Sequence, residues 1–484
     1  MKKYILFLIL TMSGKAITAQ TALAGKWKGD LEISALRTAQ VVMNIAKDPK
    51  GDLSATFDDP ARKVIGVPCD KITLRDDSLI VSIALARALF AAKINADTTE
   101  INGFWTQGDY KAPLTLQKII PRAANESKPK KINPRRPQTP EPPFDYVVED
   151  LQYNNADQTI RFGATLTKPK GEARFPVALL ITGSGRQDRD ETMLGHKPFA
   201  VIADYLTKRG IAVLRVDDRG AGKTTGNFAA ATTADFAKDV ESGIAYLKTR
   251  ADIDPAKIGL IGHSEGGMIA IMLGAERKNL AFIVLLAAPG IKNIDLLERQ
   301  GLDLLRSAGA PEKDVAIYQP LYKEMIKAVL GAKDSAQADK RATHAFKNWQ
   351  AKAGPEVVLR TTNVTDAASL QKYIAATVRS ANAPWYKYFV AYDPADNLRR
   401  VACPVLALNG SKDIQVASAE NLAAIKAGLA KSPAPSFRTL ELQGLNHLFQ
   451  RCAKCSYSEY GQLEETFSPD ALTLIGDWII KVTK

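Results

Sequence analysis

Residues 257–277 read KIGLIGHSEGGMIAIMLGAER, and the strongest signal for the fold of this chain lies here. An apolar run, residues 257–262, ends at a glycine and leads at once into a segment with helical character. Such a run is typical of a strand buried on both faces of a parallel sheet. The pentapeptide at the junction, residues 262–266, fits the pattern G-x-S-x-G, which carries meaning only between a strand and a helix. Both flanks are present, so the junction predicts a strand–turn–helix unit.

Ser264, at the centre of that junction, is predicted to be a nucleophile. A strained turn between strand and helix projects a serine hydroxyl beyond the sheet, and the flanking glycines let the two elements pass without collision. The backbone N–H of Glu265, at the N-terminus of the helix, can then face the oxyanion of a tetrahedral intermediate. The alternative interpretation is a tight turn that happens to contain a serine.

A serine hydroxyl needs a base, and the base needs an orienting acid. In chain order the acid follows the serine and the histidine follows the acid. Asp413 comes after an apolar strand, residues 403–409, and His447 comes after another strand, residues 437–442. Open parallel sheets place their sites just past the carboxyl ends of strands, so Asp413 and His447 are predicted to complete a triad.

The other three histidines fit this role less well. His263 lies within the turn itself, while His196 and His344 precede the acid along the chain. A single histidine is more often a core or surface residue than a catalytic one, which is how we interpret these three.

Strand and helix patterns alternate along the second part of the chain. Apolar runs are followed by segments with apolar residues at helical spacing, such as Phe199, Ile202, Ala203 and Leu206. The predicted strands are residues 176–182, 211–216, 257–262, 280–288, 403–409 and 437–442. Such alternation predicts an α/β fold with a mainly parallel sheet.

The loop after residues 176–182 should supply the second oxyanion donor. Ser184 N–H is the preferred candidate, and Gly185 is the alternative. The charged cluster Asp188-Arg189-Asp190-Glu191 follows. It contains no histidine or cysteine, so we favour a salt-bridged brace of the loop over a carboxylate pair or a metal site, and no metal is predicted.

Residues 217–226, DDRGAGKTTG, imitate the end of a phosphate-binding loop. That loop requires a glycine five positions before Gly222, where this chain has Asp217. We therefore interpret the segment as a glycine-rich turn and predict no nucleotide.

Several of these segments together carry a family resemblance: GSGRQDRDE, VDDRGAGKTTG, GHSEGG, WYKYFVAYDP, CPVLALNGSKD and GLNHLFQ. With them, residues from about 145 to 484 resemble the EstD-type bacterial esterases of the α/β-hydrolase superfamily, close to its dienelactone hydrolase and serine-aminopeptidase branches. The resemblance implies an α/β-hydrolase fold and a carboxylic ester hydrolase without cofactor. It also implies that Ser264, Asp413 and His447 are the triad.

The N-terminus, residues 1–19, is predicted to be a secretory signal peptide. Lys2 and Lys3 precede the apolar run YILFLILTM, and small residues follow it. The run is too short to span a bilayer, and no later run is long enough for a membrane helix. The sequence therefore predicts an exported protein, periplasmic or secreted, with no integral membrane segment after cleavage.

Two further regions precede the hydrolase-like residues 144–484. Residues 25–120 alternate apolar and polar side chains between turn signals, which indicates a small all-β domain. Its Trp27 and Trp105 are interpreted as core residues, with a sugar-stacking role as the alternative. Residues 121–143 are basic and rich in proline, and contribute to the formal net charge of +13. We favour a solvated linker over a nucleic-acid-binding arm, because export argues against nucleic acid.

Residues 290–390 interrupt the alternation with amphipathic helical patterns. An insertion at this point typically forms a lid, in which Trp385 and Phe389 are candidates to line an apolar acyl or aromatic pocket. The alternative is a helical bulge that packs on the core. The sequence leaves the ester and the oligomeric state open.

Cys452 and Cys455 follow His447 in a C-x-x-C pattern. Two cysteines are too few for a structural zinc site, and a redox dithiol belongs at a helix start in a thioredoxin-type context. Export favours a local disulfide that stiffens the loop of His447, with free thiols as the alternative.

The predicted function is an exported serine esterase that acts on a small-molecule ester. A peptidase or amidase with the same triad is the first alternative. A non-catalytic carbohydrate-binding protein is the second, and the intact order of the triad argues against it.

Overall fold

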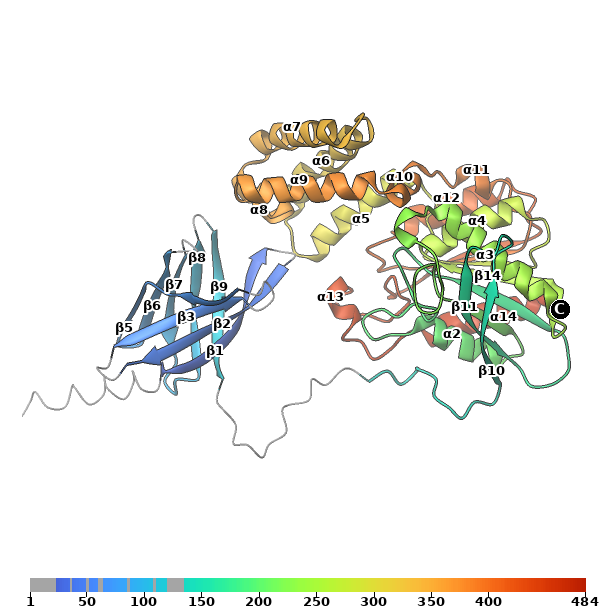
Figure 1. The fold of residues 1–484 in the computed structure, drawn as a ribbon, viewed down its shortest axis with the longest axis horizontal. Coiled ribbons are helices and arrows are strands. Elements are labelled where there is room, and N and C mark those ends of the chain that lie inside the picture. Colours follow the sequence, from blue (N-terminus) through green and yellow to red (C-terminus); the bar gives the residue numbers. More distant parts are fainter. Residues whose placement is uncertain are drawn as a thin grey trace, which may run out of the picture. The chain divides into compact units, whose positions relative to one another are not determined.

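The computed structural model describes residues 23–34, 37–48, 52–59, 64–84, 88–107, 110–119 and 135–484. The predicted signal peptide, residues 1–19, lies outside these ranges. The chain divides into two compact units, residues 1–130 and residues 131–484 (Figure 1). Across the described ranges, no helix combines the length and the apolar character needed to cross a membrane.

The first unit is a nine-stranded antiparallel sheet, with the order β4-β3-β2-β1-β9-β8-β7-β6-β5. Its strands are β1 (Gly25–Ser34), β2 (Arg37–Lys47), β3 (Leu53–Asp59), β4 (Val64–Pro68), β5 (Lys71–Arg75), β6 (Ser78–Ile83), β7 (Ala88–Ile94), β8 (Glu100–Gln107) and β9 (Tyr110–Ile119). Trp27 and Trp105 both lie in its hydrophobic core, as predicted. Neither ring is therefore available to stack on a sugar.

The second unit is built on an eight-stranded sheet in the order β10-β11-β13-β12-β14-β15-β16-β17. Its strands are β10 (Val147–Asn154), β11 (Arg161–Lys168), β12 (Phe175–Ile181), β13 (Ala212–Val216), β14 (Ile253–His263), β15 (Ile283–Leu286), β16 (Val405–Gly410) and β17 (Phe437–Leu442). The first two strands pair antiparallel, and every pair from β13 to β17 is parallel. The carboxyl ends of the parallel strands therefore meet at one edge, where the predicted site residues follow β12, β14, β16 and β17.

Helices cover both faces of this sheet because successive side chains of a strand point to opposite faces. On β12, Val177, Leu179 and Ile181 belong to one core cluster, which includes residues of α3, α4 and α12. Ala178 and Leu180 belong to another, which includes residues of α2 and α14. These helices are α2 (Pro198–Thr207), α3 (Thr233–Thr249), α4 (Glu265–Glu276), α12 (Ser418–Leu429) and α14 (Pro469–Thr483) (Figure 1).

The predicted strand at residues 280–288 is shorter in the structure, where β15 covers Ile283–Leu286. It ends at Ala287, whose φ of +49° is incompatible with an extended strand. The turn places Ala288 under the nucleophile helix, because a Cβ added to Gly267 would lie 2.4 Å from the Ala288 side chain.

A helical insertion separates β15 from β16, as the sequence predicts. It comprises α5 (Asn293–Ser307), α6 (Glu312–Leu330), α7 (Ser335–Ala353), α8 (Pro355–Thr362), α9 (Ala367–Asn382), α10 (Pro384–Ala391) and α11 (Ala395–Leu398). Leu321, Phe346 and Val378 belong to a hydrophobic core that the insertion forms by itself. Figure 1 shows α6 to α9 as a separate helical group joined to the sheet through α5 and α10.

Part of the predicted linker, residues 135–143, is held against the second unit. Arg136 donates to the carbonyl oxygens of Leu463 and Gly461, each at 2.7 Å. The Gln138 side chain donates to Phe467 O and accepts from Thr466 N. These residues are therefore anchored rather than solvated along their whole length.

Candidate active site

Ser264 lies in a strained turn between β14 and α4. Its φ of +52° and ψ of −117° are unusual for a residue with a side chain. A Cβ at Gly262 would lie 2.1 Å from Gly266 O, and one at Gly266 would lie 2.1 Å from Ile181 O. Only glycine fits at these two positions, so the G-x-S-x-G pattern follows from the close approach of strand and helix.

Asp413 and His447 form a buried hydrogen-bonded pair. His447 Nδ1 lies 2.7 Å from Asp413 Oδ2, and the backbone N–H groups of Gln415 and Val416 donate to Asp413 Oδ1. Since the carboxylate favours the tautomer in which Nδ1–H donates a hydrogen bond to it, the Nε2 atom of the neutral ring is left as an acceptor. The pair is therefore arranged to present a base.

Ser264 and His447 line one cavity at the carboxyl edge of the sheet. The same cavity is lined by Ser184, Trp385 and Phe389, by the ionisable side chains of Glu191 and His263, by apolar side chains and by three glutamines. The structure thus brings Asp413 into contact with His447 and places His447 and Ser264 on the wall of the same cavity.

The N–H groups of Ser184 and Glu265 are the predicted oxyanion donors. Within the described ranges, neither has a protein acceptor at hydrogen-bond distance, whereas the N–H of Gly183 donates to Glu191 Oε1 at 2.7 Å. Gly183 is therefore already bonded, while the two predicted donors remain available to a bound group.

The Glu265 side chain has a role that the sequence did not indicate. It is buried, and its Oε1 atom accepts from Thr233 Oγ1 at 2.6 Å and from Trp385 Nε1 at 2.8 Å. Burial raises the pKa of Glu265, and hydrogen bonds from Thr233, Trp385 and Ser184 oppose that shift. This carboxyl group links α10 of the insertion to the nucleophile turn.

Trp385 and Phe389 lie one helical turn apart on α10. Their rings stack with centroids 5.1 Å apart, and Phe389 is buried. The Trp385 ring is fixed by its hydrogen bond to Glu265, so the aromatic wall of the cavity is tied to the nucleophile turn.

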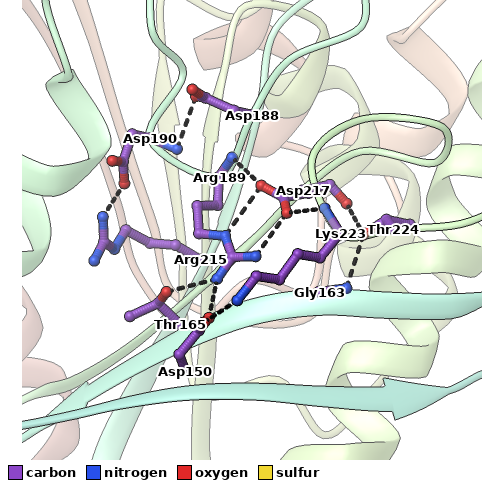
Figure 2. A network of polar contacts seen from close by, with 10 residues as sticks. All are labelled: Asp150, Gly163, Thr165, Asp188, Arg189, Asp190, Arg215, Asp217, Lys223 and Thr224. Atoms are coloured by element: carbon purple, nitrogen blue, oxygen red, sulfur yellow. Dashed lines mark hydrogen bonds and ion pairs between the residues drawn. The ribbon is translucent and has the colours of Figure 1, made fainter.

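Three members of the charged cluster, Asp188 to Asp190, brace the loop after β12, as predicted (Figure 2). Arg189 donates from Nε and Nη2 to Asp217 at 3.0 and 2.6 Å, and its Nη1 reaches Asp150 and Thr165. Asp190 pairs with buried Arg215. The network therefore ties the loop after β12 to β10, β11 and β13 and to the turn that begins at Asp217.

The glycine-rich turn, residues 217–226, wraps around its own first carboxylate. Lys223 N donates to Asp217 Oδ2, and Thr224 Oγ1 donates to Asp217 O (Figure 2). Asp218 accepts from Thr182 Oγ1 and Gln187 N, and burial, partly offset by these bonds, raises its pKa to about 7. Both aspartates thus hold the loop that follows β12 in place.

The fourth member of the cluster, Glu191, points elsewhere. Its Oε1 atom lies 2.9 Å from His263 Nδ1, and His263 Nε2 lies 3.0 Å from the backbone oxygen of His447. All three residues are buried. The sequence placed His263 in the turn but gave no sign of this chain of contacts, because the residues are far apart in sequence.

Cys452 and Cys455 are joined by a disulfide, with their Cα atoms 5.0 Å apart. The Glu459 carboxylate accepts from the N–H groups of Ala453, Lys454 and Cys455 and closes the same loop. Among the described residues, no group of three or more His, Cys, Asp or Glu side chains is arranged to hold a metal ion.

Comparison with known proteins supports the fold. The family described as "Serine aminopeptidase, S33" matches residues 197–431, a range that contains Ser264 and Asp413 and ends before His447. The chain is 31% identical to Esterase EstD of Thermotoga maritima over 195 residues. This aligned segment covers 39% of this chain and 46% of that protein. The chain is 26% identical over 145 residues to the uncharacterized protein YfhR of Escherichia coli K12, which covers 30% of this chain and 48% of that protein.

The chain thus spans about half the length of the curated relatives that it matches. A Pyrococcus furiosus esterase structure aligns with 69% of this chain and 91% of its own chain, at 14% identity and a TM-score of 0.41. The predicted fold class, an α/β-hydrolase preceded by a small all-β domain, is confirmed.

Proposed function

We propose that this α/β-hydrolase cleaves carboxylic esters of small molecules through an acyl-enzyme intermediate. The observation that supports the proposal most directly is the Asp413–His447 pair, which opens onto the cavity that Ser264 lines. In this proposal Ser264 is the nucleophile, His447 is the base and Asp413 orients it.

The reaction has two halves. Ser264 Oγ attacks the ester carbonyl carbon while His447 Nε2 takes the hydroxyl proton. The N–H groups of Ser184 and Glu265 stabilise the oxyanion. The bond between the carbonyl carbon and the alcohol oxygen then breaks, and His447 returns the proton to the leaving alcohol. A water molecule, deprotonated by His447, then attacks the acyl carbon. The bond between that carbon and Ser264 Oγ breaks, His447 returns the proton to Ser264, and the carboxylic acid leaves.

Hydrolysis of peptides or amides by the same residues is the second candidate, favoured by the match to the serine aminopeptidase family. An aminopeptidase must hold a substrate ammonium group, and a buried cation needs a carboxylate partner. Of the described residues that line the cavity, Glu191 alone is acidic, and it already accepts from Gly183 N and pairs with His263. We therefore favour a neutral ester over an aminoacyl substrate.

Export is part of the same proposal. It rests on the signal-like residues 1–19 and is supported by the Cys452–Cys455 disulfide, since such bonds persist in oxidising compartments. Periplasmic or secreted protein is the expected location, and fractionation of the producing cells tests it.

A substrate panel tests the function. Acetyl, butyryl, longer acyl and feruloyl esters are compared with aminoacyl esters and amides, using wild type and Ser264→Ala. We expect turnover of neutral esters by wild type alone, with covalent labelling of Ser264 by a fluorophosphonate. Preferential turnover of aminoacyl amides would favour the peptidase instead.

A further inference from the structure

A second histidine–carboxylate pair lies beside the proposed triad. His263 and His447 have ring centroids 4.7 Å apart, and each ring has a carboxylate on its Nδ1 side. Glu191, which partners His263, also accepts from the N–H of Gly183, the residue before the proposed oxyanion donor Ser184. Three catalytic segments therefore meet at this pair: the loop after β12, the nucleophile turn and the loop of His447.

Both ring nitrogens of His263 face acceptors. Nδ1 faces the Glu191 carboxylate, and Nε2 faces the carbonyl oxygen of His447, which has no proton to donate. A neutral imidazole carries one N–H and satisfies one acceptor, whereas the cation satisfies both. Burial works against a charge on His263, yet Glu191 outweighs it and the pKa of His263 is raised.

The backbone conformation at Glu191 directs its side chain toward His263. Its φ of +51° lies in the left-handed region, and its N–H donates to Asp188 O. Space is also limited at Gly183, where a Cβ would lie 3.2 Å from both Glu191 Oε1 and Ser264 Cβ. The left-handed backbone at Glu191 and the tight space at Gly183 together indicate that this contact is closely packed.

We propose that Glu191 and His263 form a buried ion pair that positions the reacting groups of the proposed hydrolase. Through Gly183 the pair turns the peptide that carries the Ser184 N–H toward the cavity. Through His447 O it fixes the loop of the base. Both are positioning residues, because they act through Ser184 and His447 and touch no reacting atom. The inference rests on the proposed function.

Glu191→Gln and its neighbour Asp190→Asn make a matched pair. Each removes one carboxylate charge from the same loop, but Asp190 pairs with Arg215 whereas Glu191 pairs with His263. For Glu191→Gln we expect kcat on a neutral ester to fall about ten- to a hundredfold, the cost of a small misplacement of reacting groups, with KM within about threefold. Asp190→Asn should lower kcat less than about threefold.

The charge of His263 gives a readout that does not depend on activity. The chain has 4 histidines, so nitrogen-15 spectra of ring-labelled protein are simple, and His263→Asn assigns the signal. In wild type at neutral pH we expect both ring nitrogens of His263 to be protonated, and in Glu191→Gln only one. A neutral His263 in wild type would overturn the ion pair even if the variants fail to fold.

The two proposals fail in different ways. Ester turnover that persists in Ser264→Ala removes the proposed function whatever the state of His263. An inactive Ser264→Ala together with equal kcat for Glu191→Gln and Asp190→Asn removes only the positioning role.

Discussion

This protein contains two neighbouring histidine–carboxylate pairs. They differ in what the second ring nitrogen, Nε2, of each histidine contacts. His447 Nδ1 lies 2.7 Å from Asp413, and His263 Nδ1 lies 2.9 Å from Glu191. Both histidines line the cavity that contains Ser264, but the Nε2 atom of His263 lies at hydrogen-bond distance from the backbone oxygen of His447. A buried pair of this kind is thus a candidate base only where its second ring nitrogen is left open to a substrate.

The largest loss of activity is expected when the proposed base, His447, is removed. His447→Ala removes the proposed base and should lower kcat at least about 10⁴-fold, as should Ser264→Ala, because members of a triad act as a unit. The double variant should be no worse than either single one. Steady-state kinetics on an acetyl ester, with circular dichroism to verify folding, makes the measurement. A kcat of His447→Ala within tenfold of wild type would show that His447 is not the base.

Asp413→Asn tests the two carboxylates against each other. The amide no longer favours the Nδ1–H tautomer of His447 or stabilises its cation, so kcat should fall roughly 10³- to 10⁴-fold. That loss exceeds the one expected for Glu191→Gln, since Asp413 contacts the base itself. Equal losses in the two variants would mean that both pairs orient the base equally.

The sequence was sufficient for the first pair and not for the second. Ser264, Asp413 and His447 were predicted because each follows a strand that ends at the same edge of a parallel sheet. The contacts of His263 join residues 72 and 184 positions apart, and no periodicity reports such contacts. The left-handed backbone at Glu191 is equally invisible in a sequence, since glutamate gives no sign of a positive φ.

The fold shows the same division. Alternating apolar runs predicted the sheet and its helices, because burial on one face imposes a period on the sequence. The hydrophobic core that the helical insertion forms by itself was not predicted, since amphipathic helices do not specify their partners. Residues 121–143 were predicted to be a solvated linker, although Arg136 and Gln138 bond to backbone atoms more than 300 positions away.

The aromatic wall offers a smaller effect that should leave both pairs intact. Trp385→Phe removes the donor to Glu265, and Phe389→Leu changes the shape of the cavity wall. We expect the ratio of butyryl to acetyl turnover to change about tenfold, at the lower end of the roughly 1–3 kcal/mol that one methylene is worth in an apolar pocket. Relative rates that stay constant across the ester panel would assign both residues to core packing instead.

The smallest effect concerns the disulfide, which lies on the His447 side of the comparison. Changing Cys452 and Cys455 together to Ser opens a loop of only a few residues, so the chain-entropy contribution lost is about 2 kcal/mol, less any strain. The Glu459 carboxylate still holds the N–H groups of that loop, so His447 should keep its place and kcat should fall less than about threefold. We expect a lower melting temperature and no response to added zinc or chelator.

The nitrogen-15 signal of His263 should be unchanged, because its contacts, the Glu191 carboxylate and the His447 carbonyl, both lie before the cysteines in the chain. Loss of the cationic His263 signal in the double variant would show that the disulfide supports both pairs rather than the loop of His447 alone.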